Sequence, residues 1–356
     1  MGEIAAKGII SLLPVVLTLV LAFWTKDAII SLMIGCITGV MIAGFDPATG
    51  LSKLFQHALG NADFIWVVMI EIAIGIMIAF YFKAGVISAF AEAASKRIKT
   101  RRQASGIGWV MGVLIFFSDY FSPLFSGPIA RPLTDKHKVS REMLAYELDS
   151  GSAPVCTIIP LSAWAVYIAG LLKGYGPIQT AEQGMNTFVR SIPYNFYGIL
   201  AVVLAGLIAY QIIPNFGPMK KAEERALKEG KVIRDGATPL SGIEMDQITA
   251  AEGKTPNLVV YLLIPVLIVI GIALGTFIIL KSTKTLEAFF AAVMYQAVAL
   301  AIGGYFKSVK DFMDTATRGI KAVMPAIMIL ALAYCINDIS KALGPRSTSS
   351  PWPSPG

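Results

Sequence analysis

Charged residues are scarce in this sequence. Asp, Glu, Lys and Arg make up only 15% of its 356 residues, whereas a soluble domain carries about 25%. Apolar runs that are long enough to cross a bilayer recur from end to end. These runs are continuous and do not alternate between apolar and polar residues, which argues against an outer-membrane β-barrel. The sequence therefore predicts an all-α polytopic membrane protein, with the lipid bilayer as its first partner.

Cysteine and histidine are also scarce, which leaves little room for metal or redox chemistry. The three cysteines, Cys36, Cys156 and Cys335, lie far apart in apolar runs and form no CxxC pair. We therefore expect them to be small buried hydrophobic residues. The two histidines, His57 and His137, are predicted to lie in loops and cannot form a metal site alone. No nucleophile–base constellation or phosphate loop appears, so we expect neither an enzyme nor a resident cofactor.

Positive charge is concentrated in short loops. The net charge of +7 comes from Lys and Arg between apolar runs, where they set membrane topology, so we expect no nucleic-acid partner. The clusters at Lys96–Arg102 and Arg131–Arg141 should both be cytoplasmic. The two apolar arms between them have only about ten residues each, too short for full spans. We predict a re-entrant hairpin over about residues 104–130 that turns at Ser118–Pro123. Two short full spans with an external turn are the alternative.

The remaining apolar runs fall into two similar sets. Residues 1–213 are predicted to form a first transmembrane repeat, with a broken span over about residues 142–172 that is interrupted at Asp149–Pro154. Residues 214–257 form a cytoplasmic loop, and residues 258–344 begin a second repeat. The full spans expected at the start of the two repeats are Gly8–Trp24, Ala28–Phe45 and Phe64–Phe82, and then Leu258–Leu280, Leu286–Phe306 and Ala322–Leu343.

A shift of 259 positions aligns the two sets. It brings three glycines onto glycines: Gly44 onto Gly303, Gly60 onto Gly319, and Gly85 onto Gly344. An odd number of crossings separates the copies, so the second copy should run upside down, as in many secondary transporters. The predicted fold is therefore an inverted-repeat secondary transporter with a re-entrant hairpin and broken helices.

The sequence changes character after Gly344. It continues as PRSTSSPWPSPG, a polar segment rich in proline and serine that can neither span a membrane nor pack in a core. We expect residues 345–356 to be a disordered, non-native tail and the second repeat to be incomplete. A truncated fragment is favoured over a native protein that is short.

Two carboxylates within the apolar runs, Asp119 and Asp149, are the candidate ion- and proton-binding residues, with sodium as the metal ion. A charge near the midplane costs at least about 2.5–3.5 kcal/mol, so such a residue usually faces a cavity and serves ion or proton transfer. Protons and sodium can compete for the oxygens of one buried carboxylate. Side-chain hydroxyls and the carbonyls of a broken helix could add the hard oxygen ligands that sodium needs. The hydroxyl candidates are Ser118, Ser122, Ser150, Ser152 and Thr157, and the helix-breaking candidates are Pro123, Gly127, Pro128, Gly151 and Pro154.

Each acidic candidate also has a structural interpretation. Asp119 could cap a half-helix at the turn of the hairpin. Asp149 follows Arg141 by eight residues, about 12 Å along a helix, so it could lie near the cytoplasmic interface. Glu71 lies in the middle of a predicted span and could be a proton-linked group or the partner of a basic residue such as Lys83.

Four motifs carry a resemblance to a known family. They are FFSDYF (Phe116–Phe121), GPIARPLTDK (Gly127–Lys136), SREMLAY (Ser140–Tyr146) and DSGSAPVC (Asp149–Cys156). In combination they closely resemble the NhaC family of Na+/H+ antiporters, within the ion-transporter superfamily. The resemblance covers the first repeat well and the second repeat to about Gly344.

The resemblance implies a secondary active transporter in the cell (inner, cytoplasmic) membrane, crossing it several times. It implies exchange of cytoplasmic sodium for external protons through membrane-embedded carboxylates, with Na+ and H+ as the transported partners. A homodimer is left open. The family also includes exchangers of organic acids such as malate and lactate, so a sodium- or proton-coupled carrier of a small organic anion or amino acid is the alternative, for which Arg190 is the candidate anion ligand. An inactive fragment is the third alternative.

Overall fold

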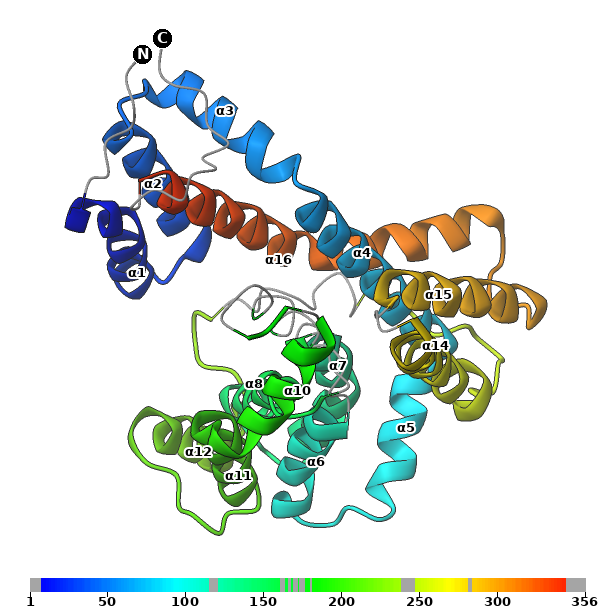
Figure 1. The fold of residues 1–356 in the computed structure, drawn as a ribbon. Helices are drawn as coiled ribbons and strands as arrows, with labels where there is room; N and C mark the ends of the chain where they lie inside the picture. Colours follow the sequence, from blue (N-terminus) through cyan, green and yellow to red (C-terminus); the bar gives the residue numbers. More distant parts are fainter. Residues whose placement is uncertain are drawn as a thin grey trace. The chain divides into compact units, whose positions relative to one another are not determined.

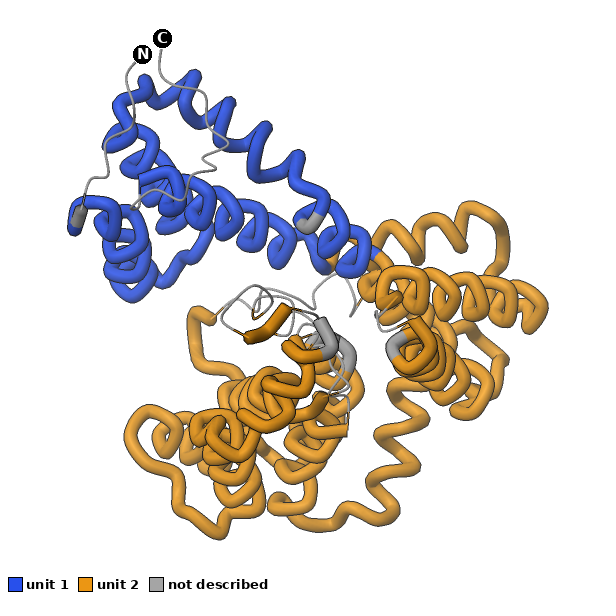
Figure 2. The backbone as a smooth tube through the Cα atoms, in the orientation of Figure 1, with its two compact units in different colours: residues 1–72, 323–356 blue, residues 73–322 orange. Residues whose placement is uncertain are grey.

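A computed structural model describes residues 8–114, 121–160, 181–237, 247–280 and 284–343, together with a few positions between 164 and 179. Its regular structure is helical throughout these residues (Figure 1). The expected all-α class is thus confirmed. The chain divides into two compact units, residues 1–72 with 323–356 and residues 73–322 (Figure 2). Each unit is described below by itself.

Candidate membrane spans are plentiful in the described residues. Four helices are long and apolar enough to cross a membrane, and up to six spans result if each of two sharply bent helix pairs counts as one. One bent pair joins helices at 110°, and the other at 52°. The described residues therefore contain several candidate spans, as a polytopic membrane protein requires.

The first unit is built from the N-terminal helices and the end of the last helix. Asp27 caps α2, because its side chain accepts a hydrogen bond from the Ile30 N–H at 2.9 Å. Asp46 caps α3 in the same way and is followed by Pro47 at the first helical position, where proline is favoured. The helices of this unit are α1 (Leu13–Thr25) after the 3-10 turn η1 (Gly8–Leu12), α2 (Ala28–Ile42), α3 (Pro47–Leu59), the start of α4 (Ala62–Ala84) and the end of α16 (Val309–Leu343).

The core of the first unit joins α2, α3 and the end of α16. Cys36 and Val40 of α2, Leu54 of α3, and Cys335 and Ile339 of α16 are all fully buried in one apolar cluster. All three cysteines of the chain are buried, which confirms the prediction that they act as small hydrophobic residues.

His57 was predicted to lie in a loop, and this prediction is wrong. It lies in the last turn of α3, because residues 47–59 between two predicted spans form a helix that begins at the Asp46 cap. Its ring Nδ1 lies 2.7 Å from a carboxylate oxygen of Asp338 on α16.

The second unit holds the segments that were predicted to be the hairpin, the cytoplasmic loop and the start of the second repeat. Its helices before the loop are the end of α4, α5 (Val86–Ser95), α6 (Arg101–Leu114), α7 (Phe121–Lys136), α8 (Arg141–Cys156), α10 (Ala181–Ser191), the 3-10 turn η2 (Ile192–Tyr194) and α11 (Phe196–Ala209). Those that follow are α12 (Gly217–Glu229), the π-turn η3 (Val259–Leu263), α14 (Ile264–Leu280), α15 (Thr285–Ile302) and the start of α16.

The last helix differs from the prediction. A loop was expected between Phe306 and Ala322, yet α16 begins at Val309 and continues to Leu343. Gly319 does not break this helix, because α16 packs there directly on α4. A Cβ atom at Gly319 would lie 2.4 Å from the carbonyl oxygen of Gly75. Glycine therefore serves a close helix–helix approach at this position and not a turn.

The C-termini of α2 and α15 have the same cap. In α2 the Ala43 N–H donates to Gly39 O, and Gly44 takes a φ of 88°. In α15 the Gly303 N–H donates to Ala299 O, and Gly304 takes a φ of 67°. The next N–H reaches back in both cases, from Phe45 to Val40 O at 3.2 Å and from Tyr305 to Leu300 O at 2.9 Å. This is the Schellman pattern. The two glycines in the left-handed region, Gly44 and Gly304, are 260 positions apart, one more than the shift of 259 that aligns the glycines in the sequence.

Candidate functional site

The two arms of the predicted hairpin are α6 and α7, which are connected through residues 115–120. Ala104 of α6 and Leu133 of α7 share one apolar cluster. At the other end the Ser122 hydroxyl donates to the carbonyl oxygen of Gly112 at 3.4 Å. The arms are therefore antiparallel. Two of the predicted ligands, Ser118 and Asp119, lie in the connection and outside the described residues.

The predicted turn at Ser118–Pro123 extends too far along the chain. Helix α7 begins at Phe121, so Pro123 lies in its first turn. Proline is tolerated there because the first backbone N–H groups of a helix have no acceptor within the helix. Gly127 and Pro128, also predicted as helix breakers, lie inside α7 as well.

The predicted interruption at Asp149–Pro154 is also displaced. Helix α8 is continuous from Arg141 to Cys156. Pro154 falls in its last turn, and the Thr157 N–H donates to Pro154 O at 3.1 Å as the helix closes. Residues 157–160 are not helical. The break in this segment therefore follows Pro154, which has no N–H to donate to the carbonyl of Ser150 and so weakens the last turn of the helix.

Glycine lines the contact between α6 and α8. A Cβ atom at Gly112 would lie 3.1–3.3 Å from three backbone atoms of Gly151, and a Cβ atom at Gly151 would lie 3.2 Å from Trp109 O. The two backbones therefore touch without a side chain between them, as small residues allow in membrane helices. Gly151 is a packing residue of α8 and not the site of a helix break.

The carboxylate that α8 presents to this contact is Glu147, which the sequence arguments did not single out. Glu147 is 0% exposed. Its Oε1 accepts a hydrogen bond from the Ser105 hydroxyl of α6, and its Oε2 has no hydrogen-bond partner in the described structure. Gly108 of α6 leaves the room for this oxygen, because a Cβ atom there would lie 2.6 Å from Oε2.

Helical spacing could have identified Glu147. The buried residues of α8 include Met143, Leu144, Glu147, Leu148 and Gly151, and three- and four-residue steps put these on one face of a helix. Asp149 lies off this face and is exposed. The assumption of a helix break at this point hid the spacing.

The hydroxyl candidates of α8 bind nearby backbone. The Ser152 hydroxyl is buried and donates to Leu148 O at 2.7 Å. The Thr157 hydroxyl donates to Pro154 O at 2.8 Å and accepts from the Asn195 amide at 3.0 Å. Ser150 is half-buried. The structure therefore does not gather these hydroxyls around Asp149. In the described part of the chain, no group of three or more His, Cys, Asp or Glu side chains could hold a metal ion.

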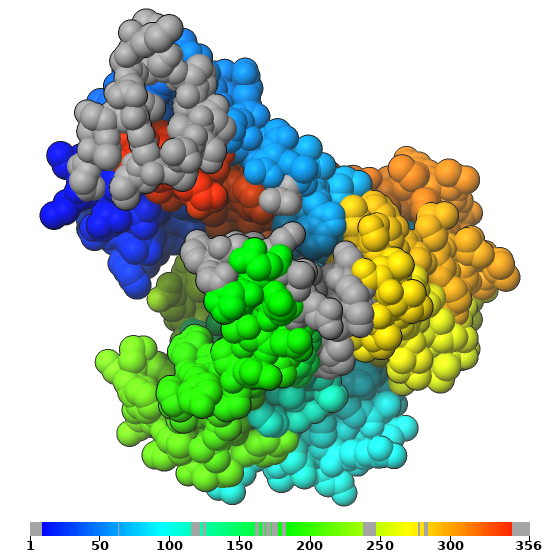
Figure 3. Space-filling view, viewed as in Figure 1, coloured from blue at the N-terminus to red at the C-terminus, as the bar shows by residue number. Residues whose placement is uncertain are grey.

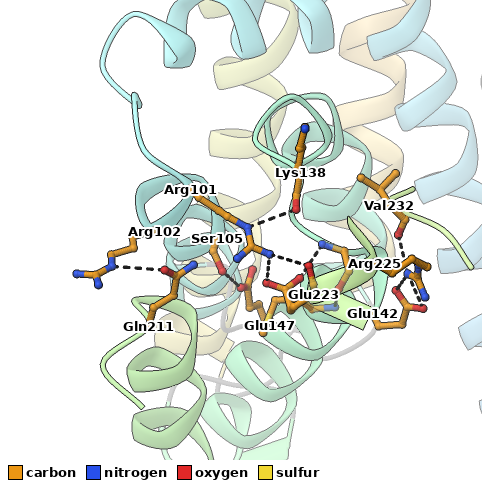
Figure 4. A network of polar contacts seen from close by, with 12 residues as sticks. Arg101, Arg102, Ser105, Lys138, Glu142, Glu147, Gln211, Glu223, Arg225 and Val232 are labelled. Carbon is orange, nitrogen blue, oxygen red and sulfur yellow. Dashed lines mark hydrogen bonds and ion pairs between the residues drawn. The ribbon is translucent and has the colours of Figure 1, made fainter. Parts of the chain in front are cut away.

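A polar network lies at the first turns of α6 and α8 (Figure 4). An Arg101 guanidinium nitrogen lies 2.5 Å from Glu223 Oε2, and the Ser140 N–H donates to Glu223 Oε1 at 2.8 Å. Arg225 contacts both oxygens of Glu142, at 3.0 and 2.8 Å. Helix α12 (Gly217–Glu229) lies in the segment that was predicted as a loop. These contacts join it to the first turns of α6 and α8.

Comparison of the sequence with known proteins identifies the family of this chain. A sequence profile described as the Na+/H+ antiporter family matches residues 155–347, more than half of the chain. The chain belongs to the Na+/H+ antiporter family. This is a family of transporters and not of enzymes, as the resemblance implied. Membership indicates secondary transport that couples a cation to protons.

One curated relative extends the comparison to the hairpin. An uncharacterized protein of Haemophilus influenzae is 29% identical over 369 aligned residues, which cover 94% of this chain and 67% of that protein. No solved structure matches the chain.

Two further predicted residues can now be placed in the antiporter-family chain. Glu71 is buried in α4, and its Oε2 has no partner in the described structure. It is not the partner of Lys83, which instead lies 2.8 Å from Asp311 Oδ1. Glu71 and Lys83 are about 18 Å apart along the helix, too far for contact. That alternative for Glu71 is wrong.

Arg190 was the candidate ligand for an organic anion. Helix α10 lies on the surface of the second unit in the space-filling view (Figure 3). Arg190 in its last turn is exposed. An exposed arginine does not make a buried anion site, so nothing in the described structure favours the organic-anion alternative.

Proposed function

We propose that the chain is a Na+/H+ antiporter of the cell (inner) membrane, which exchanges cytoplasmic sodium for external protons. Membership of the Na+/H+ antiporter family carries this proposal. The proposed exchange uses membrane-embedded carboxylates, because sodium and a proton can compete for the same carboxylate oxygens. Competition at one site is enough for exchange when the site opens to one side of the membrane at a time.

Asp119 and Asp149 are the proposed carboxylates. Asp119 belongs to the connection between α6 and α7, and Asp149 lies on α8, which packs on α6 through Gly112 and Gly151. The antiparallel arms, with Ser122 bonded to Gly112, support a hairpin over about residues 104–130. The positive clusters at both ends of this segment support a re-entrant path from the cytoplasm.

An inverted repeat is part of the same proposal. The matching caps after α2 and α15 support it, because both helices end in a Schellman motif with glycine in the left-handed region. In addition, η1 and α1 precede α2 as η3 and α14 precede α15. In this alignment of the two repeats, Gly44 corresponds to Gly304.

Everted membrane vesicles test the proposed exchange. Respiration acidifies the lumen of such vesicles, and added Na+ should release protons, which a pH-sensitive dye reports. Asp119→Asn and Asp149→Asn should each abolish this release, whereas Glu224→Gln on the exposed side of α12 should not. Lack of Na+-dependent release by the unaltered protein would refute antiport. Normal release by either Asn variant would refute the role of that carboxylate.

A further inference from the structure

We propose that Glu147 is a cation-binding carboxylate of this protein, and that its Oε2 is the atom that takes Na+ between α6 and α8. The inference deepens the proposed antiport and rests on it for the choice of cation. It adds to the transport pathway a residue that lies two positions from Asp149 but on the buried face of the same helix.

The Glu147 side chain is buried, and one of its two carboxylate oxygens has no hydrogen-bond partner in the described residues. Glu147 is completely inaccessible, and a buried carboxylate is expensive unless a donor or a cation reaches both of its oxygens. Ser105 satisfies Oε1, while Oε2 has no hydrogen-bond partner in the described residues. The bare oxygen is therefore the acceptor that a bound cation would satisfy.

The neighbouring charges do not fill this role. Among the described residues, Arg101 and Glu223 are charged side chains near Glu147. Arg101 lies 2.5 Å from Glu223, which also accepts the Ser140 N–H. The guanidinium is thus engaged one turn away, toward the cytoplasmic loop. Ala130 of α7 packs in one apolar cluster with Leu144 and Leu148 of α8, which flank Glu147 along its helix.

The surroundings of Oε2 are shaped for an oxygen ligand. Gly108 provides the space, because a Cβ atom in its place would lie 2.6 Å from Oε2. The Ser105 hydroxyl can turn its hydrogen to Oε1 and still offer a lone pair. Carboxylate and hydroxyl oxygens are hard ligands of the kind that sodium prefers.

The position of Glu147 suits an ion that arrives from the cytoplasm. It lies six residues, or about 9 Å, beyond the start of α8 at Arg141. The network of Arg101, Glu223, Arg225 and Glu142 marks that end of α8 (Figure 4). A cation that enters beside this network would reach Glu147 before the middle of the membrane.

Equilibrium binding of radioactive Na+ to the purified full chain in detergent tests the inference without transport. The unaltered protein should bind Na+, and Glu147→Gln should lose this binding because the neutral amide has no negative oxygen. Gly108→Ala should weaken binding by crowding Oε2. Glu224→Gln, an exposed carboxylate on α12, is the matched control and should bind as the unaltered protein does. Glu147→Asp should bind more weakly but measurably, which distinguishes a lost ligand from a misfolded chain.

The outcomes separate this inference from the proposed function. Loss of Na+ binding in Glu147→Gln supports the inference even if the vesicles show no antiport, which would refute the exchange alone. Unchanged Na+ binding in Glu147→Gln overturns the inference, whether or not antiport occurs. No Na+ binding by the unaltered protein overturns it as well. If the carboxylate binds only a proton, Na+ binding will be absent or independent of Glu147, and the cation assignment is wrong.

Discussion

The Arg101 guanidinium and the Glu223 carboxylate form an ion pair, 2.5 Å apart, that joins the first turn of α6 to α12. Glu223 is almost completely buried and has a second partner in the Ser140 N–H at the start of α8. One carboxylate of α12 therefore holds together two helices of the candidate site.

Removal of this carboxylate should loosen the second unit. Glu223→Ala leaves the Arg101 guanidinium and the Ser140 N–H without their acceptor, which should cost about 1–3 kcal/mol. Glu223→Gln should cost less, since its amide oxygen can still accept from Ser140. Unfolding in detergent measures both losses. Glu224→Gln is the control, and an equal loss in the control would contradict the role assigned to Glu223.

A methyl group at Gly112 should separate α6 from α8. Its Cβ would meet backbone atoms of Gly151 at 3.1–3.3 Å, and backbone cannot turn aside as a side chain can. We expect Gly112→Ala to destabilise the protein by about 1–3 kcal/mol. Gly271→Ala on α14 is the matched control, because nothing lies within 4 Å of its Cβ position; there alanine should be neutral or stabilise by up to about 1 kcal/mol. Equal behaviour of the two variants would argue against the close contact.

Lys83 and Asp311 should be energetically coupled. The Lys83 ammonium is buried and lies 2.8 Å from Asp311 Oδ1, which joins the end of α4 to the start of α16. Lys83→Met and Asp311→Asn should each destabilise the protein, and the double variant should lose less than the sum of the two. A double-mutant cycle measures this coupling, which we expect at about 0.5–3 kcal/mol. Additive losses would show that the pair contributes little.

The two ends of the hairpin should be reached from the cytoplasm. Lys99 precedes α6 and Lys136 ends α7, so both lie at the same end of this antiparallel pair. Both are exposed, and both lie in basic segments. A cysteine at either position should react with a membrane-impermeant maleimide in everted vesicles and not in intact cells. Asn186→Cys on α10, in a segment with little positive charge, should show the reverse. The native cysteines are fully buried and should give little background. Labelling of Lys99→Cys and Lys136→Cys from opposite sides would exclude the hairpin.

The sequence was sufficient for the helical class and for most of the span positions. Hydropathy predicted Leu258–Leu280, and the structure has Val259–Leu280 across η3 and α14. Cap residues, which the prediction did not use, carry a similar signal, since Asp27 and Asp46 start α2 and α3. These signals are local, and a short window of sequence contains all the information they need.

Helix breaks were less predictable because glycine and proline have more than one use. Gly151 was expected to break a helix and Gly319 to lie in a loop, but each allows two helix backbones to touch. Pro123 lies in the first turn of its helix, where proline is tolerated, and Pro154 lies in the last turn, shortly before the helix ends. Only the neighbouring helix decides between a break and a close contact, and the sequence does not show that neighbour.

The candidate site illustrates the same limit. Asp149 was chosen for its place beside Gly and Ser in an apolar run, whereas Glu147, two residues earlier, is the carboxylate that α8 buries. Once α8 is known to be a continuous helix, the spacing of its buried residues selects Glu147. The sequence analysis therefore missed Glu147 as a candidate beside Asp149, because it expected the helix to break at Asp149–Pro154.

The glycine-lined contact between α6 and α8 has a mechanical consequence. Helices that meet through long side chains can slide past each other when those side chains change rotamers. Gly112 and Gly151 place no side chain between α6 and α8. A displacement of α6 along α8 would drive neighbouring side chains into backbone. In any rearrangement of the second unit, α6 and α8 should therefore move together as one rigid body. The backbone should bend mainly at the non-helical residues 157–160.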